Sequence, residues 1–401
     1  MRRTEHAVLS RDRLNRATLG RQLLLERAAI RPTTAIRRIG GLQAQEPASP
    51  YLALWSRLAQ FDPAALDRAF QQRRVVKATL MRTTLHVVTR DDYIHLLPAT
   101  LRMLRGLNRR GQGPEPAPER IHALAEAALV FASRPRPNSE LREHLAGIVD
   151  DMSADDALWL VRRYTAWVHA PSIVPWSFGR RPILTGGSAW LGGTSFADEA
   201  PALEYLARHY LAAFGPASVA DMAAWSGLAI ARLRPALATI DAGEGLRRYS
   251  DERGRELFDL AGCSVPAAEV DAPARFLPMW DSALLAYADR TRLIDDAHRK
   301  VVTARNGDTL PTFLVNGRVA GLWWAEADGT RSRISLEPFV RLGRGERRDV
   351  DREGERLADF VGPIEPAVFG RYRTTRARAS VPEIPRRARS AARPSRSSTP
   401  T

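Results

Sequence analysis

The order of the expected secondary-structure elements is the feature that most constrains the fold of this chain. Apolar spacing predicts three helices near the start, over residues 11–30, 33–39 and 50–60, and Ser49 is placed to cap the third. Runs of β-branched residues within 75–88 then predict strands. Three short helices followed by a β-ribbon are typical of a winged helix-turn-helix.

The same order of elements recurs twice more along the chain. A Gly/Pro-rich linker at 111–118 precedes the second copy, in which the Pro/Gly-rich stretch 171–187 is expected to form a wing. The third copy holds the clearest helix-turn-helix, with Ser218 placed as a cap and Ser226-Gly227 as the turn. This repeat is one of element order and not of residue identity. The helices expected in the two copies are 119–132, 138–145, 154–168, 202–214, 219–225 and 229–240, and two short strands are expected within 245–260.

The last third of the chain has a different character. The pair Asn316-Gly317 predicts a two-residue hairpin turn between two strands within 312–324. A further strand is expected over residues 332–336. We therefore expect an α+β protein in which winged-helix units are followed by a small β-rich, barrel-like domain. The expected division is 1–110, 119–198 and 199–265 for the winged-helix units, 111–118 for the linker, 266–370 for the β-rich domain and 371–401 for a disordered basic tail.

The charge of the chain is compatible with a polyanionic partner but does not require one. The net charge is +15 and the sequence pI is about 10.9. Lys77 and Lys300 are the only lysines, and such an arginine bias often reflects a GC-rich genome. Residues 371–401 carry nine arginines and one glutamate, which leaves a net charge of +7 for the rest of the chain. A body with this charge is consistent with DNA binding.

Several classes of protein are disfavoured by the sequence. Cys263 is the only cysteine, so disulfide frameworks and cysteine-based zinc sites within one chain are excluded. The eight histidines show no ligand spacing, and the glycine-rich run 186–193 lacks the Walker lysine and is expected to be a loop, so neither a metal nor another cofactor is expected. No apolar run reaches about 18 residues and no secretory signal is expected, which fits a cytoplasmic, nucleoid-associated protein.

Two glutamines stand out behind the first expected helix pair. The glycine pair 40–41 is expected to end a helix, after which the chain should be extended. In an extended segment Gln43 and Gln45 point the same way, while Leu42 and Ala44 face the core. Two parallel amides can hold a water or bind a polar ligand edge. The alternative is that both are ordinary loop glutamines.

A second candidate is the polar face of the first β-ribbon. Alternation places Arg82, Thr84 and His86 on one face of that ribbon, with Leu85 and Val87 on the other. A guanidinium there suits a phosphate, and an imidazole can form hydrogen bonds or exchange protons. The alternative is a face that is simply solvated.

Five sequence segments, taken in order along residues 10–345, resemble those of the AlkZ-like winged-helix DNA glycosylases. The combined order is fairly specific, whereas no single segment is. The segments are Leu42-Gln43-Ala44-Gln45, Leu80-Met81-Arg82-Thr83-Thr84-Leu85-His86, Phe214-Gly215-Pro216-Ala217-Ser218 with Trp225-Ser226-Gly227-Leu228, Leu277-Pro278-Met279-Trp280-Asp281-Ser282, and Gly317-Arg318-Val319-Ala320-Gly321-Leu322-Trp323.

The resemblance implies a fold, an activity and a catalytic pair. The fold would be tandem winged helices and a C-terminal β-barrel forming a C-shaped clamp on duplex DNA. The activity would be monofunctional hydrolysis of the N-glycosidic bond of alkylated purines, including interstrand crosslinks. The family's catalytic Gln-x-Gln matches Gln43 and Gln45, and glutamine at the second position points to the branch that acts on crosslinks and natural-product adducts.

This chemistry is physically reasonable for two amides. Alkylation at N7 gives the purine a positive charge, so the base is already a good leaving group. Amide oxygens then need only to place a water below the anomeric carbon and stabilise an oxocarbenium-like sugar. The residues expected to contact alkylated duplex DNA are Arg37, Arg38, Arg57, Arg82, Thr84, His86, Arg232 and Arg234.

The alternative function is a noncatalytic DNA-binding protein, such as a transcriptional regulator. Such a protein would read sequence with the helix 229–240, which carries Arg232 and Arg234, and would usually be dimeric. The sequence contains no coiled-coil heptad or other obvious dimerisation element, which favours a monomeric enzyme.

Overall fold

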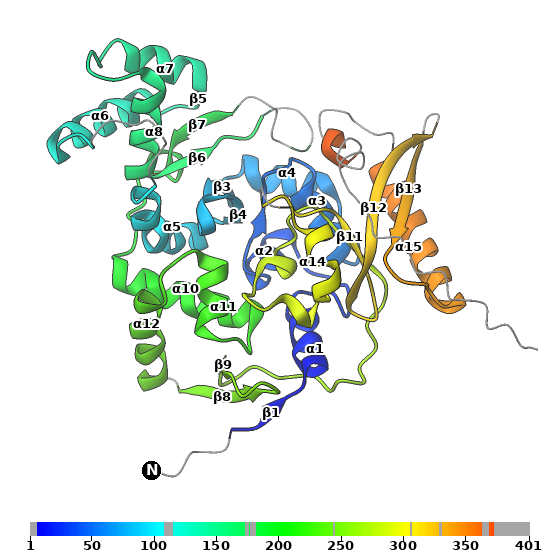
Figure 1. Ribbon diagram of the computed structural model, residues 1–401. Helices are drawn as coiled ribbons and strands as arrows, with labels where there is room; N and C mark the ends of the chain where they lie inside the picture. The colour runs from blue at the N-terminus through cyan, green and yellow to red at the C-terminus, as the bar shows by residue number, and fades with distance from the viewer. Residues whose placement is uncertain are drawn as a thin grey trace, which may run out of the picture.

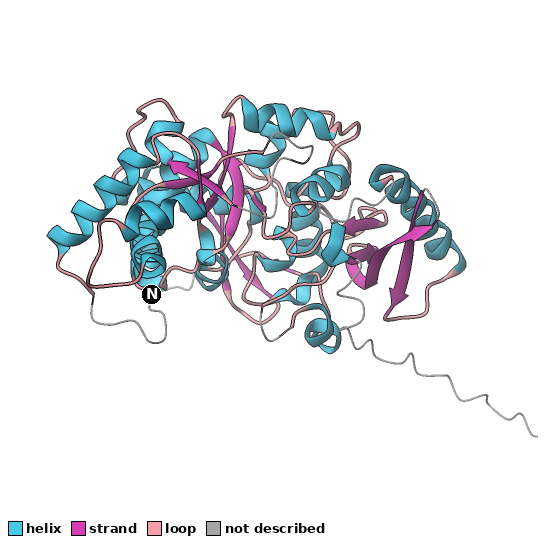
Figure 2. Ribbon diagram, turned by 90° about the horizontal axis from the view of Figure 1, so that it is seen from above, coloured by secondary structure: helices cyan, strands magenta, loops and turns pink. Residues whose placement is uncertain are grey.

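The chain has a mixed α+β fold in which three sheets are combined with helices (Figure 1). A computed structural model describes residues 6–107, 115–172, 176, 182–243, 245–304, 307–328, 331–362 and 369–372. Seen from above in Figure 2, strands lie between helices over most of the molecule, and one sheet lies at the end with a helix against it.

The first helix is shorter than its sequence pattern predicts. Helix α1 ends at Arg21, because Leu23 takes a left-handed conformation with φ 57° and Ala28 then pairs with Leu58. The N-cap of the third helix is Ala48, one residue before the predicted Ser49. The elements up to residue 105 are α1 (Arg11–Arg21), α2 (Pro32–Arg38), β2 (Leu42–Gln43), α3 (Ser49–Arg57), α4 (Pro63–Gln71), β3 (Val75–Thr79), the 3-10 turn η1 (Met81–Thr83), β4 (Leu85–Thr89) and α5 (Arg90–Arg105).

One six-stranded sheet joins the first and second sets of elements. Its order is β2-β4-β3-β6-β7-β5, and the junction is the antiparallel pairing of β3 with β6, where Lys77 lies opposite His169. The helix predicted over 154–168 ends at Tyr164, since Trp167 already belongs to β6. The second set of elements is α6 (Pro118–Phe131), β5 (Arg136–Pro137), α7 (Asn138–Ala146), α8 (Ala154–Tyr164), β6 (Trp167–His169), β7 (Ile183–Gly186) and the short helix α9 (Gly187–Trp190), where a loop was expected.

The third set follows its sequence signals closely. Ser218 caps α11 in a reciprocal capping box with Asp221, and Gly227 ends the helix with φ 81°. The strands β8 and β9 form the hairpin expected within 245–260, and β1 (Val8–Leu9) adds to β8 in parallel. The elements are α10 (Glu199–Phe214), α11 (Val219–Ser226), α12 (Ile230–Gly243), β8 (Leu246–Asp251) and β9 (Glu256–Leu260).

The C-terminal sheet is open, so the expectation of a barrel-like domain is corrected. Its strand order is β10-β11-β12-β13, and the two outer strands do not pair with each other. Asn316 and Gly317 make the predicted turn, with φ 47° and 76°. Helix α15 was not predicted, although Val350, Leu357 and Val361 give it an apolar stripe that packs on the sheet. The elements are β10 (Arg275–Leu277), α13 (Ser282–Leu285), the 3-10 turn η2 (Arg290–Arg292), α14 (Asp296–Val302), β11 (Thr312–Val315), β12 (Arg318–Asp328), β13 (Arg331–Pro338) and α15 (Arg344–Val361).

Two predictions fall partly outside the described residues. The first four residues of the linker lie outside them, and Pro118 already begins α6. Of the tail predicted to be disordered, only Arg371 and Tyr372 are described, and Tyr372 is fully buried. None of the described helices is both long and apolar enough to cross a membrane.

Candidate active site

The two glutamines follow a sharp turn that only glycine fits. Gly40 and Gly41 have φ values of 80° and 87°, and a Cβ at Gly41 would lie 2.9 Å from Val88 Cγ1. The turn ends α2 and leads directly into β2. There Gln43 lies opposite His86 of β4 in the antiparallel register.

Gln43 is turned into the protein. Its side chain lies on the opposite face of the strand from Leu42, and the residue is only 6 % exposed. Its Oε1 is buried and has no hydrogen-bond partner among the residues that the structure describes. Leaving a buried acceptor without a hydrogen bond costs about 1–3 kcal/mol of folding free energy. This oxygen is therefore suited to accept a hydrogen bond from a ligand or a water.

Gln45 has a different environment. The chain bends after Ala44, and Gln45 is exposed. Its Oε1 accepts from the backbone N–H of Leu85 at 2.9 Å, while Ala44 N donates to Leu85 O at 2.8 Å. Leu42 and Ala44 are buried as predicted. Gln43 is buried and Gln45 is exposed, because the extended segment ends before Gln45, and that the two amides face the same way stays a prediction.

The expected polar face of the β-ribbon is interrupted by a turn. Arg82 and Thr83 have φ values of 51° and 61°, which breaks the alternation on which that expectation rested. Arg82 Nη1 donates to Trp225 O at 2.6 Å, and Thr84 Oγ1 donates to Met81 O at 3.1 Å. Arg82 is half-buried at the end of α11 and does not lie on an open strand face.

His86 is a neutral imidazole beside Gln43. It is 2 % exposed, and burial, assisted by the nearby charge of Arg82, lowers its pKa to about 3. Its Nδ1 lies 2.9 Å from Thr84 O, a pure acceptor, so Nδ1 carries the proton and Nε2 is left as an acceptor. At neutral pH this group can accept a hydrogen bond but adds no positive charge.

Arg57 does not fit the expected phosphate contact. It is 1 % exposed, and its Nη1 and Nη2 donate to the two carboxylate oxygens of Asp281 at 2.8 and 2.7 Å. It also donates to Ala53 O at 3.1 Å. Its guanidinium therefore links α3 to the start of α13 and is closed to DNA.

The remaining predicted DNA contacts lie on helix surfaces. Arg38 on α2 and Arg234 on α12 are exposed, and neither forms an ion pair with a described residue. Arg37 is exposed but lies 3.5 Å from the carboxylate of Asp92, and Arg232 pairs with Glu199. The structure thus brings Gln43 opposite His86 at β2 and β4, with Arg82 in the preceding turn η1.

A family model for DNA glycosylase AlkZ-like proteins matches residues 36–360. The chain belongs to the AlkZ-like DNA glycosylase family. It is 25 % identical over 362 residues to the interstrand DNA cross-link repair glycosylase of Streptomyces sahachiroi, a match that covers 85 % of this chain and 94 % of that protein. Its fold is similar to the solved structure of Streptomyces sahachiroi DNA glycosylase AlkZ, with a TM-score of 0.72, 21 % identity and coverage of 88 % and 96 % of the two chains.

Sequence reasoning missed a C-terminal anchor beside the Gln-x-Gln motif of this AlkZ-like glycosylase. Arg371 donates to Glu46 at 3.1 Å and to Asp308 at 2.8 Å, and its guanidinium lies 4.7 Å from the centre of the Trp280 ring. Burial raises the pKa of Glu46, and Arg371 opposes that rise. No signal in the sequence pointed to this contact, because Arg371 looks like one more arginine of a basic tail.

A buried lysine was also missed. Lys77 is 6 % exposed on β3, and burial lowers its pKa to about 8, while the carboxylate of Glu46 acts in the opposite direction. It lies on the face of β3 shared with Val87 and opposite to that of His86. Lys77 therefore belongs to the other side of the sheet from Gln43.

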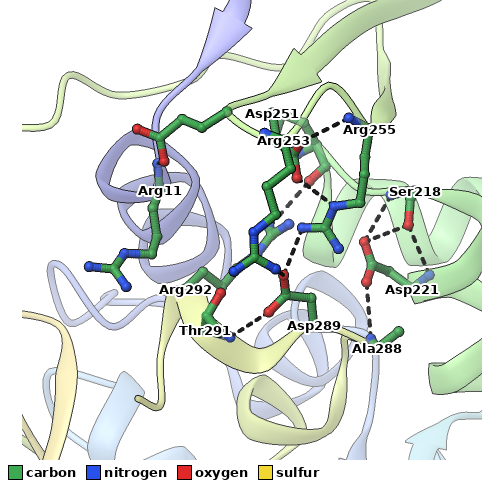
Figure 3. A network of polar contacts seen from close by, with 12 residues as sticks. Arg11, Ser218, Asp221, Asp251, Arg253, Arg255, Ala288, Asp289, Thr291 and Arg292 are labelled. Atoms are coloured by element: carbon green, nitrogen blue, oxygen red, sulfur yellow. Dashed lines mark hydrogen bonds and ion pairs between the residues drawn. The ribbon is translucent and has the colours of Figure 1, made fainter. Parts of the chain in front are cut away.

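Two further observations concern the rest of the surface. Among the described residues, no group of three or more His, Cys, Asp or Glu side chains is placed to hold a metal ion. A polar cavity of about 280 Å³ lies at α1, the β8–β9 turn and η2, and part of its lining is drawn in Figure 3. None of its lining residues belongs to the Gln-x-Gln motif, and the lining is Arg11, Asp12, Leu14, Asp251, Glu252, Arg253, Arg255, Asp289, Thr291 and Arg292.

Proposed function

We propose that this DNA glycosylase hydrolyses the N-glycosidic bond of bulky alkylated purines in duplex DNA, including bases joined in interstrand crosslinks. Gln43 and Gln45 would position the attacking water. Membership of the AlkZ-like family supports the reaction class. The name of the Streptomyces sahachiroi relative, an interstrand cross-link repair glycosylase, supports the substrate class.

The observation that carries the proposal is the unpaired Oε1 of Gln43. It is a buried acceptor that no donor of the described residues reaches. Gln45 supplies a second amide whose oxygen is fixed by Leu85 N and keeps one lone pair for a water proton. A water that donates to both oxygens directs its own lone pair away from them, toward the sugar.

The reaction needs little proton transfer. The bond between C1′ and the base nitrogen breaks, the electron pair neutralises the cationic alkylated base, and the water oxygen bonds to C1′ and releases a proton to solvent. The amide dipoles stabilise the positive charge that develops on the sugar. His86 stays neutral in this environment and so adds no repulsion against that charge.

DNA binding would come from the three successive sets of helices and strands acting as winged helices of a monomeric, C-shaped clamp. Exposed arginines such as Arg38 and Arg234 would contact phosphates, so affinity would fall with salt. The noncatalytic alternative is less well supported, because the family is one of glycosylases.

The test compares base release by the wild type and by glutamine variants. The substrates are a duplex with one N7-methylguanine and a duplex with one nitrogen-mustard interstrand crosslink, and the readout is alkali-labile abasic sites. We expect Gln43→Ala and Gln45→Ala each to lower single-turnover release about 100-fold while leaving duplex affinity nearly unchanged. Gln71→Ala, an exposed glutamine on α4, is the matched control. A Gln43→Ala, Gln45→Ala double variant with wild-type turnover would refute the assignment.

A further inference from the structure

The sheet alone does little to fix the side chain of Gln45. Strand β2 ends at Gln43, and Gln45 is exposed beyond that end. Among the described residues, the side chain of Gln45 has one hydrogen bond, which its Oε1 accepts from Leu85 N at 2.9 Å. An exposed side chain with a single hydrogen bond keeps one orientation only where the backbone that carries it is fixed. The contacts of the next residue, Glu46, therefore decide how well Gln45 is held.

Glu46 is held by an arginine 325 residues further along the chain. Arg371 Nη1 donates to Glu46 Oε1 at 3.1 Å, and Arg371 Nη2 donates to Asp308 Oδ2 at 2.8 Å. The guanidinium also lies over the Trp280 ring, 4.7 Å from its centre. Two carboxylates and one aromatic face together fix the plane of a guanidinium. Since the Glu46 side chain is only 14 % exposed, this contact fixes the backbone directly after Gln45.

Trp280 has an unusual backbone conformation at this contact. Its φ is 55°, which is rare and costly for a bulky residue. Its backbone N–H donates to Thr309 O at 3.2 Å, and its Nε1 donates to Gly307 O at 3.0 Å. These two hydrogen bonds hold the strained residue with its ring against Arg371. Backbone strain of this kind is concentrated at functional sites.

Tyr372 fixes the backbone on the other side of Arg371. It is fully buried, and its hydroxyl lies 2.9 Å from Ser49 Oγ and accepts from Met279 N at 3.0 Å. Ser49 lies three residues after Glu46. Arg371 and Tyr372 therefore hold two points of the segment that follows the Gln-x-Gln motif.

The charges around Arg371 do not suit a phosphate contact. Its guanidinium already faces the carboxylates of Glu46 and Asp308. Two neighbouring negative charges oppose the approach of a third from DNA. Loss of the Arg371 side chain should therefore change the geometry at Gln45 more than the affinity for duplex DNA.

We propose that Arg371 is a positioning residue for base release: by holding Glu46 it keeps Gln45 where the amide oxygen can direct the attacking water. The proposal rests on the proposed function for the role of Gln45. The position of Gln45 is also measured without base release, through hydrogen exchange of the Leu85 amide.

The first experiment compares single-turnover base release and duplex affinity in the full chain. Arg371→Gln is expected to release N7-methylguanine about 10-fold more slowly than the wild type, because small displacements of a catalytic group are costly. Its affinity for the duplex should change little. Arg371→Lys keeps one charged contact and should recover part of the rate. The control is Arg347→Gln, at an exposed arginine of α15 paired with Asp351, which should keep the wild-type rate.

A double-variant cycle identifies the residue through which Arg371 acts. Glu46→Gln is expected to slow base release about as much as Arg371→Gln does. The two changes together should cost no more than either alone, because both remove the same contact. The matched cycle combines Arg371→Gln with Asp308→Asn. Independent losses for Arg371 and Glu46 would overturn the proposal, and non-additivity with Asp308 alone would assign the effect to that acid.

Hydrogen exchange tests the position of Gln45 itself. Arg371→Gln is expected to speed exchange of the Leu85 N–H about 10-fold, since Gln45 Oε1 is its acceptor, while Arg347→Gln leaves it unchanged. Urea unfolding of the same samples checks that each variant is folded. Unchanged Leu85 exchange in a folded Arg371→Gln variant overturns the proposal, whatever its rate of base release.

The remaining outcomes separate this proposal from the proposed function. Faster Leu85 exchange with a wild-type rate of base release, in a protein that needs Gln45, also overturns the role of Arg371. If Leu85 exchange is faster but Gln45→Ala releases bases at the wild-type rate, the catalytic assignment fails. The contact between Arg371 and Glu46 then still positions Gln45.

Discussion

The side-chain oxygen of Gln45 accepts a hydrogen bond from the backbone N–H of Leu85 at 2.9 Å. Ala44 donates its backbone N–H to Leu85 O. In a regular antiparallel ladder the carbonyl of Ala44 would in turn accept from the N–H of Leu85. The glutamine therefore extends the β2–β4 pairing by one hydrogen bond after the chain has bent away. A residue at the proposed site is thus also part of the sheet.

This double role predicts different outcomes for two substitutions of Gln45. Gln45→Met removes the acceptor for Leu85 N, so we expect a loss of about 1 kcal/mol in unfolding free energy and a large loss of base release. Gln45→Glu keeps an oxygen at the same place and should retain most of the stability. Urea unfolding and single-turnover assays on the same preparations separate the two effects. Equal stability of Gln45→Met and wild type would argue against the hydrogen bond.

A second prediction concerns the buried pair Arg57 and Asp281, whose two hydrogen bonds of 2.7 and 2.8 Å join α3 to α13. Arg57→Met leaves a buried carboxylate without its partner and should cost about 3–5 kcal/mol in unfolding free energy. The Arg57→Met, Asp281→Leu double variant should recover much of this loss. Urea unfolding measures both. A double variant as unstable as the sum of the single changes would show that the pair is not the source of the cost.

Short-range signals explain what could be predicted from the sequence. The cap at Ser218 and the turn at Asn316-Gly317 depend on residues within four positions of each other, and both are found in the structure. The glycine pair 40–41 likewise ends α2 as expected, because both positions have positive φ values and a Cβ there would clash with Phe214 or Val88.

Two of the errors came from contacts between distant parts of the chain, and a third from the local backbone. Arg57 looked like a surface arginine because nothing near it in the sequence reveals Asp281, 224 residues away, as its partner. Tyr372 looked like tail, yet it is buried against Ser49. The alternation used for Arg82 failed because its left-handed backbone conformation ends the strand at the turn.

A third prediction concerns acid stability. Burial lowers the pKa of both His86 and His169 to about 3, below the ordinary value of 6.5. Between about pH 3 and pH 6.5 the unfolded chain therefore binds more protons than the folded chain. The stabilising effect of the neutral folded histidines is complete above about pH 6.5 and is lost as the pH falls toward 3. Each histidine should contribute a slope of roughly 1.4 kcal/mol per pH unit in this window.

The measurement is urea unfolding at several pH values between 7.5 and 4.5. His86→Phe should lower the slope of unfolding free energy against pH by the amount that corresponds to about one proton. This change in slope is expected whatever the effect of the substitution on stability at pH 7.5. His122→Gln, a change at an exposed position on α6, should leave the slope as in the wild type. A His86→Phe slope equal to that of the wild type would mean that the buried imidazole titrates normally.

The last prediction concerns the C-terminal anchor. The hydroxyl of Tyr372 lies 2.9 Å from Ser49 Oγ and accepts from Met279 N at 3.0 Å, and Arg371 pairs with Glu46 next to Gln45. Tyr372→Phe leaves a buried N–H unpaired and should cost about 1–3 kcal/mol in unfolding free energy.

Arg371→Gln should have a smaller and pH-dependent effect on this anchor. Arg371 stabilises the ionised form of Glu46, so its loss raises the pKa of Glu46 further above the ordinary value. The cost, about 1 kcal/mol or less for a partly exposed arginine, is present above the pKa of Glu46 and disappears as the carboxyl is protonated in acid. Urea unfolding of Arg371→Gln and wild type at pH 7 and pH 4 gives this difference directly. A cost that is equal at both pH values would assign the contribution of Arg371 to its contacts with Asp308 and Trp280 and not to Glu46.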